Sequence, residues 1–501
     1  MAHLPTIILD TTLSELYKQA GHDHSDTRTA HIFCGVTSAL DLTPDFPRNL
    51  KYVYQESAFT DPSDKDERFR QEMAVKHLSL VPQRDAFIAG STPVMFFHTS
   101  RNDAKMAHDI EETNKTLSVI SSDQRPEPIY SAGPGSLQKV AQRNGLKRIS
   151  SKLVIDDVVE ATDHPDGSVE CLVDADVPWY LNCKEALARS GLPTPRTKII
   201  EVDQHIEDSM MNTPGLDVMA DHNGFDMDRR TAWTDWLSSQ KEPIIEAVRQ
   251  QTLPFVVKGN QCFAGAGTHV LESESERKDL IHLLEAQLLE KLLTHIHPSN
   301  EHLNLGTIMI SDMVKDPIAN FGMTFFAIKA GEAIFLAASD QMIDAASSSW
   351  LGSTIIYSRQ AEMKKQLTPI MKKIAAWLFE HRYIGPVGAD ILQTQEGGYQ
   401  IIDLNVRTSG SLCLPLMKTH FTSRGLDAAG SISITVKESR GEFIKRFSDE
   451  FSQGRMVIVV AWYEEKDLGQ SYGDVVVGAE DMKALREAIE RVRSVGEAVT
   501  F

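Results

Sequence analysis

The sequence predicts an α/β protein that begins with a small α/β domain, continues with a two-part module of antiparallel sheets, and ends with a small β-rich module. In the first third, short apolar runs typical of strands alternate with polar helical segments, as in α/β domains. Further on, a glycine-rich loop and a double-glycine turn each join two strand-like runs, which indicates antiparallel pairs. The C-terminal stretch combines strand-like runs with a charged helix. We therefore separate 1–178 as the first domain and 431–501 as the last module.

Composition limits the class of function. The chain has 501 residues, of which 42% are hydrophobic and 24% charged, with a formal net charge of −19. This is typical of a soluble globular protein, and the acidic excess argues against nucleic acid or an anionic membrane as a partner. The five cysteines are scattered without a CxxC pair, which favours reduced thiols. The N-terminus has no signal-peptide pattern, and no apolar run approaches the length of about 20 residues that a helix needs to cross a bilayer. We therefore expect a cytoplasmic protein.

The first domain shows no chemistry that can be assigned, but its elements can be predicted. Apolar runs alternate with polar segments there, which predicts strands and helices in turn. Strands are predicted at Thr6–Leu9, Ala86–Ala89 and Val94–Phe97, a polar helix at Asn102–Lys115, and a further strand within Arg148–Val158.

The second part opens with a short helix that carries a lysine. Asn182 is the predicted N-cap of a helix over Lys184–Ser190, because asparagine is favoured at that position. A strand over Thr197–Val202 and a helix over Thr231–Gln251 are predicted next. Taken alone, Lys184 is most simply a solvated helix residue.

A glycine-rich loop follows the next strand. The strand Pro254–Lys258 ends on a lysine, and the loop beyond it contains Gly259, Gly265 and Gly267 before a second strand, Thr268–Leu271. A Walker A loop instead places its lysine after the glycines and directly before a helix. We interpret this loop as a flap whose backbone N–H groups can close over phosphates, with the lysine fixed at its base. A plain β-hairpin that ends in a lysine remains the alternative.

Further strands and two helices lead to the most informative stretch. Ser273 and Glu276 have capping-box spacing. The predicted elements are a helix at Ser275–His297, antiparallel strands at Leu305–Val314, Asn320–Lys329 and Ala333–Ala338, a polar loop at Ser347–Ser349 and Gly352–Thr354, and a helix at Gln360–His381. The last helix has an apolar stripe typical of core packing, formed by Met363, Leu367, Ile370, Ile374, Trp377 and Leu378.

The stretch Gly388–Arg407 predicts a hairpin with a chemical face. Gly397 and Gly398 supply the turn between its two strands. Side chains alternate faces along a strand, so Ile402, Leu404 and Val406 share one face of the second strand. The other face carries Asp403, Asn405 and Arg407. A carboxylate, an amide and a guanidinium beside an apolar face indicate one wall of a site.

The register of this hairpin predicts a metal site. If the turn has an even number of residues centred between Glu396 and Gly397, Asp390 pairs with Asp403 on one face. Two carboxylates placed there repel unless a cation neutralises them, and Mg²⁺ is held by one or two carboxylates together with phosphates. An odd-length turn breaks the pairing, and a surface hairpin in which Arg407 pairs with either acid remains the alternative.

The chain closes with a donor-rich loop and a small β-rich module. The loop Thr408–Ser411 follows the hairpin directly and is rich in backbone N–H groups. Beyond it we predict strands at Ile432–Val436, Met456–Tyr463 and Asp474–Val477, and a helix at Asp481–Val495.

Four segments between about residues 179 and 425 together resemble the ATP-grasp ligases, in order and in spacing. The resemblance implies that Lys184 and Lys258 contact ATP phosphates and that Gly265, Gly267 and Thr268 belong to the flap. It implies that the backbone near Asp312 and Val314 holds the adenine. The family usually has glutamates at the start of this hinge and at the ribose, where this chain has Ser311 and Asn320.

The resemblance also covers the metal and catalytic groups. It implies that Asp390, Asp403 and Asn405 bind Mg²⁺, with Mn²⁺ as an alternative, and that Arg407 faces the transferring phosphate and the substrate carboxylate. We expect the N–H groups near Gly410 and Ser411 to stabilise an oxyanion. The first third looks like the family's pre-ATP-grasp domain, and the resemblance implies a lid subdomain at 179–305 and a metal and catalytic subdomain at 306–430.

The function implied is a carboxylate–amine ligase. It would use ATP to convert a small carboxylic acid to an acyl phosphate and would join it to an amino-acid-like amine, with release of ADP and phosphate. By analogy with the family, a homodimer is expected. A carboxylase-type or kinase-type activity without an amine remains open, although no biotin-attachment MKM sequence is present. A non-catalytic ATP sensor is the third hypothesis.

Overall fold

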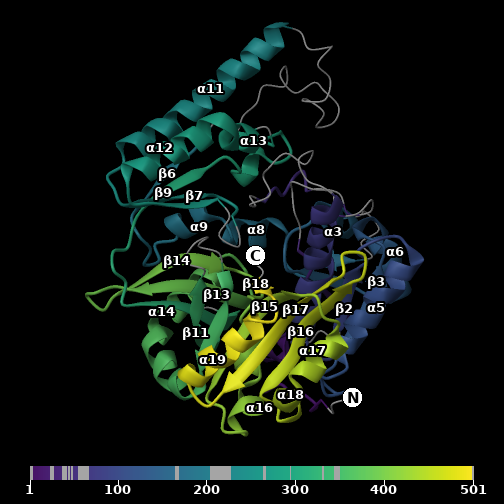
Figure 1. The fold of residues 1–501 in the computed structure, drawn as a ribbon. Coiled ribbons are helices and arrows are strands. Elements are labelled where there is room, and N and C mark those ends of the chain that lie inside the picture. The colour runs from purple at the N-terminus through teal and green to yellow at the C-terminus, as the bar shows by residue number, and fades with distance from the viewer. Residues whose placement is uncertain are drawn as a thin grey trace.

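Three β-sheets organise the chain in the computed structural model (Figure 1). The structure describes residues 4–22, 28–35, 42, 46, 49–54, 67–163, 169–202, 227–262, 267–293, 295–329, 332–343 and 350–498. One sheet is parallel with five strands, one is antiparallel with four, and one has nine strands. The predicted α/β class, with an N-terminal α/β domain and antiparallel sheets after it, is confirmed.

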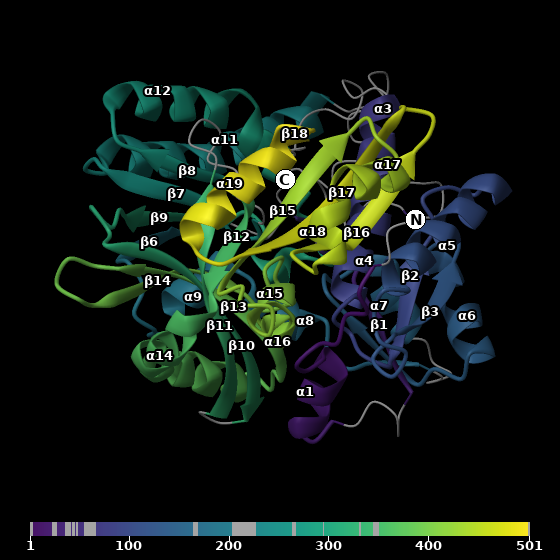
Figure 2. The ribbon, with the colours of Figure 1, turned by 60° about the horizontal axis from the view of Figure 1, so that its bottom comes forward.

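The N-terminal sheet is parallel and has the strand order β3-β2-β1-β4-β5 (Figure 2). The chain builds β1, β2 and β3 outward on one side of β1, then returns to place β4 on the other side, so the strand order reverses between β1 and β4. The strands are β1 (Thr29–Ile32), β2 (Pro93–Phe97), β3 (Glu127–Ser131), β4 (Arg148–Ser151) and β5 (Glu170–Cys171); the helices are α1 (Leu13–Gln19), α3 (Glu67–Val75), α4 (Val81–Ala86), α5 (Asp103–Leu117), α6 (Leu137–Arg143) and α7 (Asp156–Thr162), with a π-helical turn, Lys76–Leu80, between α3 and α4.

Some predictions for this domain are confirmed and others are wrong. The strand at Val94–Phe97 and the helix that begins after Asn102 are confirmed. The strand at Ala86–Ala89 is wrong, because these residues end α4 and the turn after it. All four are buried, and a short buried apolar run does not distinguish a helix end from a strand. The strand at Thr6–Leu9 is reduced to a single bridge at Ile7, and the one within Arg148–Val158 ends at Ser151.

The four-stranded sheet lies in the upper part of Figure 1 beneath three helical segments. Its order is β6-β9-β7-β8, and all its pairs are antiparallel. The capping box of Ser273 and Glu276 is confirmed. The elements are β6 (Thr197–Ile200), β7 (Phe255–Gly259), β8 (Thr268–Leu271), β9 (Ile308–Asp312), α11 (Met227–Gln250), α12 (Glu274–Leu283), a π-helical turn (Leu284–Leu288) and α13 (Leu289–Leu293), preceded in the chain by α8 (Asp176–Leu181) and α9 (Lys184–Arg189).

The largest sheet runs from the predicted hairpin to the C-terminal strands without a break. Its order is β14-β13-β10-β11-β12-β15-β17-β16, and β18 pairs with β15. The unit boundaries that we placed at 305/306 and 430/431 remain predictions. The strands are β10 (Ala319–Lys329), β11 (Glu332–Ile343), β12 (Trp350–Ile356), β13 (Gly385–Gln393), β14 (Tyr399–Asn405), β15 (Ala428–Val436), β16 (Met456–Glu465), β17 (Gln470–Ala479) and β18 (Glu497–Ala498).

Helices pack on this sheet and close its core. The six residues of the predicted apolar stripe on α14 (Gln360–Glu380) are all buried, so that prediction is confirmed. The polar loop predicted at Gly352–Thr354 is wrong, because these residues form part of β12. The strand accommodates the polar side chain of Ser353, which donates a hydrogen bond to Gln341 (3.2 Å) on the neighbouring strand. The other predicted loop residues, Ser347–Ser349, lie outside the described part of the chain. The remaining helices are α15 (Cys413–Leu416), α16 (Lys418–Thr422), α17 (Arg440–Arg446), α18 (Ser448–Ser452) and α19 (Met482–Arg493).

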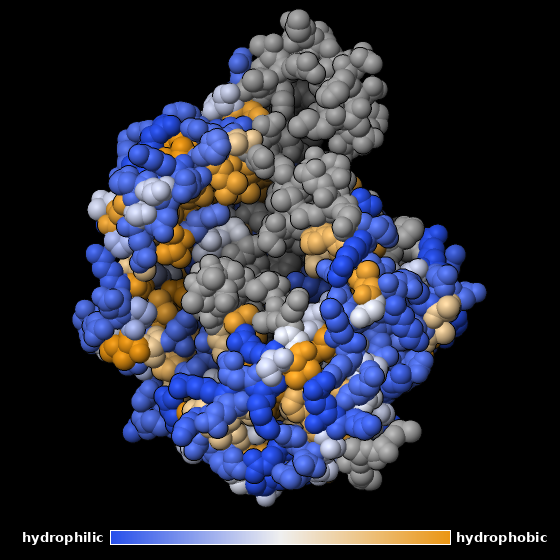
Figure 3. All heavy atoms as spheres, in the orientation of Figure 1, coloured by the Kyte–Doolittle hydropathy of each residue, from blue (hydrophilic) through white to orange (hydrophobic). Residues whose placement is uncertain are grey.

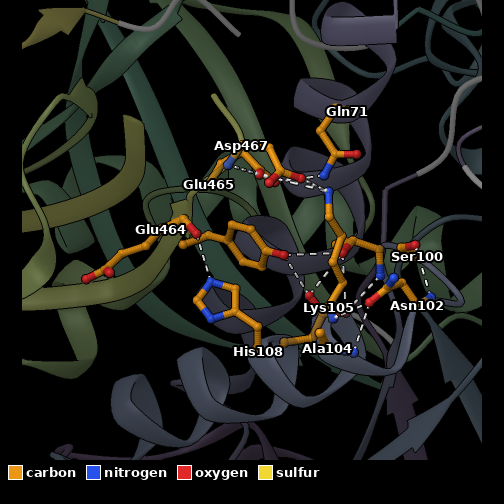
Figure 4. A network of polar contacts seen from close by, with 12 residues as sticks. Gln71, Ser100, Asn102, Ala104, Lys105, His108, Glu464, Glu465 and Asp467 are labelled. Atoms are coloured by element: carbon orange, nitrogen blue, oxygen red, sulfur yellow. Dashed lines mark hydrogen bonds and ion pairs between the residues drawn. The ribbon is translucent and has the colours of Figure 1, made fainter. Parts of the chain in front are cut away.

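A polar network fastens the N-terminal domain to the far end of the large sheet (Figure 4). His108 of α5 contacts the carbonyl oxygen of Glu464 on β16 at 2.7 Å. The hydroxyl of Tyr463 donates to the buried carboxylate of Asp109 at 2.9 Å, and Lys105 forms a salt bridge to the loop after β16 at 2.8 Å. The parallel sheet is therefore held in a fixed position beside the large sheet.

The surface is mainly hydrophilic on the face shown in Figure 3. The exposed large hydrophobic side chains come from separate elements, which is normal on a monomer surface, so the homodimer remains a prediction. No helix in the described ranges is both long and apolar enough to cross a bilayer. The exposed large hydrophobic side chains are Ile8, Leu50, Tyr180, Val270, Leu283, Ile318 and Phe379.

Candidate active site

The pairing of the two aspartates across the hairpin is confirmed. Asp390 on β13 faces Asp403 on β14, so the two carboxylates share a face of the sheet. The turn differs from the one we assumed: Gln393 pairs with Tyr399, which leaves an odd number of residues at the tip. A one-residue register shift beside Asp390 restores the pairing. The extra residue on β14 is Ile402, and such a bulge leaves a backbone group without its ladder partner.

Two lysines, one from helix α9 and one from the four-stranded sheet, converge on this part of β14. The Lys184 ammonium, at the start of α9, forms an ion pair with Asp403. The Lys258 ammonium, on β7, donates to the carbonyl oxygen of the bulged residue Ile402 at 2.7 Å. Lys184 is buried and Lys258 is half-buried. Two cations, from α9 and β7, and two acids, from β13 and β14, therefore meet at the junction.

The electrostatics separate the two acids. Burial raises the pKa of Asp390, and the neighbouring Asp403 carboxylate raises it further. Burial also acts to raise the pKa of Asp403, but the ammonium groups of Lys184 and Lys258 outweigh it, so this pKa is lowered. Burial lowers the pKa of Lys258. Asp403 thus ionises more readily than Asp390, which holds a proton more readily.

The donor set fits a hard divalent cation. Asp390, Asp403 and Asn405 supply only oxygen atoms, and alternation along β14 places Asn405 on the face of Asp403. Among the described residues, no group of three or more His, Cys, Asp or Glu side chains could hold a metal ion. Two carboxylates and an amide suit Mg²⁺, which usually completes its coordination with phosphates and water.

Gln341 on β11 is a site residue that the sequence analysis missed. Its side-chain nitrogen donates to the carboxylate of Asp390 at 3.1 Å, and its oxygen accepts from the hydroxyl of Ser353 at 3.2 Å. This chain of hydrogen bonds reaches Asp390 from β11 and β12, across the intervening strand β10. Nothing in the local sequence around Gln341 indicates it, because the contact spans 49 residues.

Asn182 has a different role from the one predicted. The N-cap of α9 is Cys183, whose own side chain makes no capping hydrogen bond. The Asn182 oxygen instead accepts from the backbone N–H of Val406 at 3.0 Å and from the guanidinium of Arg407 at 2.5 Å. Arg407 also donates to the oxygen of Asn405 at 2.7 Å. Asn182 was mistaken for a cap because an asparagine oxygen next to a helix start normally accepts a local hydrogen bond, whereas the partners of this oxygen lie 224 and 225 residues away.

Asn260 links the two lysines and was also missed. The backbone N–H of Lys184 donates to the carbonyl oxygen of Asn260 at 2.9 Å, and that of Glu185 donates to its side-chain oxygen at 3.1 Å. Asn260 therefore binds the N–H groups that begin α9. It follows Lys258 by two positions, so one short segment fixes both lysines.

The base of the glycine flap is an antiparallel hairpin, as predicted. Lys258 pairs with Thr268, and the N–H of Gly259 donates to the carbonyl oxygen of Gly267 at 3.0 Å. Gly267 has a φ of +66°, a conformation that favours glycine. Gly265 lies outside the described residues.

The residues assigned to adenosine lie on two elements. Asp312 ends β9, is exposed and pairs with Arg196 at 3.3 Å, so its side chain is engaged away from the paired aspartates; Val314 follows and is half-buried. Asn320 lies near the start of β10, two positions before Gly322, which faces Asp390. The buried side-chain oxygen of Asn320 has no hydrogen-bond partner in the described part of the structure, so it is available to a ligand.

The loop after the hairpin lies against β13. A Cβ atom added to Gly388 would be 3.5 Å from the Cβ atom of Ser409, and Gly388 is on the same face as Asp390. The hydroxyl groups of Ser409 and Ser411 are 3.4 Å apart, with Gly410 between them. The loop assigned to oxyanion stabilisation is thus adjacent to the strand that carries the first aspartate.

Comparisons with known proteins give similarities in structure only. No protein-family model and no curated protein matches the sequence. An N5-carboxyaminoimidazole ribonucleotide synthetase in complex with ADP aligns with 12% identity and a TM-score of 0.48, over 94% of this chain and 96% of its own. Biotin carboxylase from Campylobacter jejuni aligns with 10% identity and a TM-score of 0.47, over 93% and 90%. Phosphoribosylamine–glycine ligase from Thermotoga maritima aligns with 11% identity and a TM-score of 0.46, over 94% and 98%. With such low values, we base the function on the geometry of the site.

Proposed function

We propose that this protein is an ATP-dependent ligase of the ATP-grasp type that joins a small carboxylic acid to an amine and releases ADP and phosphate. One observation carries the proposal: the lysines of α9 and β7 meet the paired aspartates of β13 and β14. Phosphoryl transfer depends mainly on positioning and on neutralising the phosphate charge. Two ammonium groups, on α9 and β7, and an all-oxygen cation site on β13 and β14 supply both.

The proposal assigns the phosphate end of ATP to the two lysines, the flap and the paired aspartates. Lys184 and Lys258 bind its phosphates, and the flap that includes Gly265, Gly267 and Thr268 closes over them. Asp390, Asp403 and Asn405 would hold Mg²⁺ or Mn²⁺, which neutralises phosphate charge when bound. Without nucleotide, Lys184 neutralises Asp403, so the site tolerates its buried charges in both states.

The adenosine end is assigned to the segment that connects the two sheets. The backbone at Asp312 and Val314 holds the adenine edge, and Asn320 contacts the ribose. The buried, unpartnered oxygen of Asn320 supports this role, because buried polar atoms normally have a hydrogen-bond partner.

The reaction has two steps. An oxygen of the substrate carboxylate attacks the γ-phosphorus, the bond to the β-phosphate oxygen breaks, and ADP leaves. The amine then attacks the carbonyl carbon of the acyl phosphate, phosphate leaves with its bridging oxygen, and the nitrogen loses a proton. Arg407 orients the carboxylate, and it stabilises the oxyanion together with the N–H groups of Gly410 and Ser411. The closed flap keeps water from the acyl phosphate.

The test is an ADP-release screen with Mg²⁺ and ATP against carboxylic acids, amines and their pairs. ADP release that needs both an acid and an amine supports the ligase. Release with an acid alone supports the kinase-type or carboxylase-type alternative, and tight ATP binding without ADP under every condition supports the sensor. A cytoplasmic location and a homodimer are further parts of the proposal, to be tested by localisation and by mass in solution.

A further inference from the structure

A pocket lies between the N-terminal parallel sheet and the catalytic end of β14, with a cavity volume of about 60 Å³. His31 and Phe33 line it from β1 and the residue after it, and Ser151 and Lys152 line it from the end of β4. Arg407 closes the side that faces the hairpin. The same guanidinium that binds the metal-site residue Asn405 therefore forms one wall of this pocket.

The pocket lies where the fold itself creates a binding crevice. In the order β3-β2-β1-β4-β5, the strand order reverses between β1 and β4. Ligands of open parallel sheets bind outside the carboxyl ends of the strands at this point. The lining residues Phe33 and Lys152 directly follow β1 and β4, which places the cavity at that end.

Most of the remaining wall is apolar. It comes from α1, α7 and the segment that leads into β13, with side chains that include Tyr17, Ile155, Val158, Tyr383 and Pro386. No aspartate or glutamate is among the described residues that line the cavity. Such a wall suits an uncharged hydrocarbon or aromatic body.

The charge on the pocket wall is positive and only partly compensated. Lys152 is paired with Asp85 at 2.6 Å, a carboxylate that also accepts from Thr408 at 2.7 Å. Arg407 donates only to the amide oxygens of Asn182 and Asn405 in the hydrogen bonds described, and within 4.0 Å it has no ion pair among the described residues. A guanidinium enclosed in this way favours an anionic ligand.

A hydroxyl group in the pocket also lacks a partner. The buried oxygen of Ser151 makes no hydrogen bond in the part of the chain that the structure describes. Buried polar atoms of this kind normally have a partner, so a polar substituent on a ligand can satisfy it.

We propose that the acid substrate is an apolar monocarboxylic acid without an α-ammonium group, with its carboxylate on Arg407 and its body in this pocket. The inference rests on the proposed ligase function and specifies its substrate class. An α-amino acid is disfavoured because its ammonium would enter a cationic pocket in which no described lining residue is a carboxylate. The amine substrate then approaches the acyl carbon from another side.

The first experiment measures acid binding without ATP. Calorimetry on the full chain would compare 4-methylpentanoate with leucine and phenylacetate with phenylalanine, which differ in the α-ammonium. We expect each acid to bind about tenfold or more tightly than its amino-acid counterpart. Equal or tighter binding of the amino acids overturns the inference, as does binding of neither acid.

The second experiment fills the pocket. Ser151→Phe places a ring in the cavity, and we expect it to weaken acid binding by about tenfold or more. Ser275→Phe, the matched control, places the same ring on the exposed surface of α12 and should keep acid binding within about twofold. Unchanged acid binding in a folded Ser151→Phe protein, judged by its unfolding midpoint and ATP affinity, overturns the inference.

The two proposals fail separately. If the acids bind in a pocket-dependent manner but no acid supports ADP release, the ligase function fails while the ligand class stands. If ADP release depends on amino acids and is indifferent to Ser151→Phe, the ligase stands and the substrate class is wrong.

Discussion

The two sides of Arg407 are built on different principles. On the hairpin side, Asp390, Asp403, Lys184 and Lys258 come from two sheets and a helix, and their charges neutralise one another. On the other side, the pocket at the carboxyl ends of β1 and β4 has an apolar wall and few charges. A triphosphate with a metal ion needs dense compensating charge, whereas an organic acid needs one cation and a shaped apolar wall.

Arg407 is held at this boundary by neutral partners. Asn182 and Asn405 accept its hydrogen bonds without removing its charge, so the guanidinium can serve a phosphate on one side and a carboxylate on the other. If the two sides have the roles proposed, variants on the hairpin side will change ATP use, and variants on the pocket side will change acid use.

The largest effect is expected for Asp403→Asn. This change removes both a proposed metal ligand and the ionic partner of Lys184. We expect kcat for ADP release to fall by about 10³ or more, because a preorganised charge contact alone is worth about 10²–10³. Steady-state kinetics and ATP binding would measure it. Glu396→Gln, at the exposed tip of the same hairpin, should retain normal turnover, and full activity of Asp403→Asn would remove the metal-site assignment.

Lys258→Ala is expected to have the next largest effect. It removes an ammonium that contacts the bulged carbonyl of Ile402, and we expect a loss of about 10² in kcat/KM for ATP. Lys198→Ala on the exposed side of β6 is the matched control. An equal loss in both variants would indicate destabilisation of the four-stranded sheet and not loss of a phosphate contact.

The hairpin side could be predicted from the sequence largely because its information is local. Alternation along β14 and the turn glycines predicted that Asp390 lies opposite Asp403. The structure has this pairing, although its turn has a different length and a bulge at Ile402 restores the register. The roles of Asn182, Asn260 and Gln341 could not be predicted, because their partners are distant in sequence. The pocket was missed for the same reason: its walls come from strands and helices spread over most of the chain, with no motif in any one of them.

A smaller effect is expected for Asn182→Ala, which tests the division between the hairpin side and the pocket side of Arg407. Asn182 is a positioning residue, since it acts through Arg407. Losing one hydrogen bond to a charged group costs about 1.5–3 kcal/mol, which is about a tenfold or greater rise in KM for the acid. KM for ATP should change little. A rise in KM for ATP alone would place Arg407 with the nucleotide and contradict the division between the two sides.

The smallest effect is expected from pH, through Asp390. Its pKa is raised in the folded protein by burial and by Asp403, so its contribution to stability is present at low pH and is lost as pH rises through the folded-state pKa. A bound metal ion reverses this pH dependence, because it compensates the negative charge of the deprotonated Asp390 carboxylate.

Thermal unfolding with and without Mg²⁺ at pH 5 and pH 8 measures this effect. We expect Mg²⁺ to raise the midpoint by a few degrees more at pH 8 than at pH 5, since about 1 kcal/mol shifts the midpoint of a large domain by about 2–4 °C. Asp390→Asn should make the metal-free protein more stable at pH 8, because it removes the repulsion from Asp403, and should abolish the response to Mg²⁺. A response that survives in this variant would place the cation elsewhere and separate it from the hairpin side of Arg407.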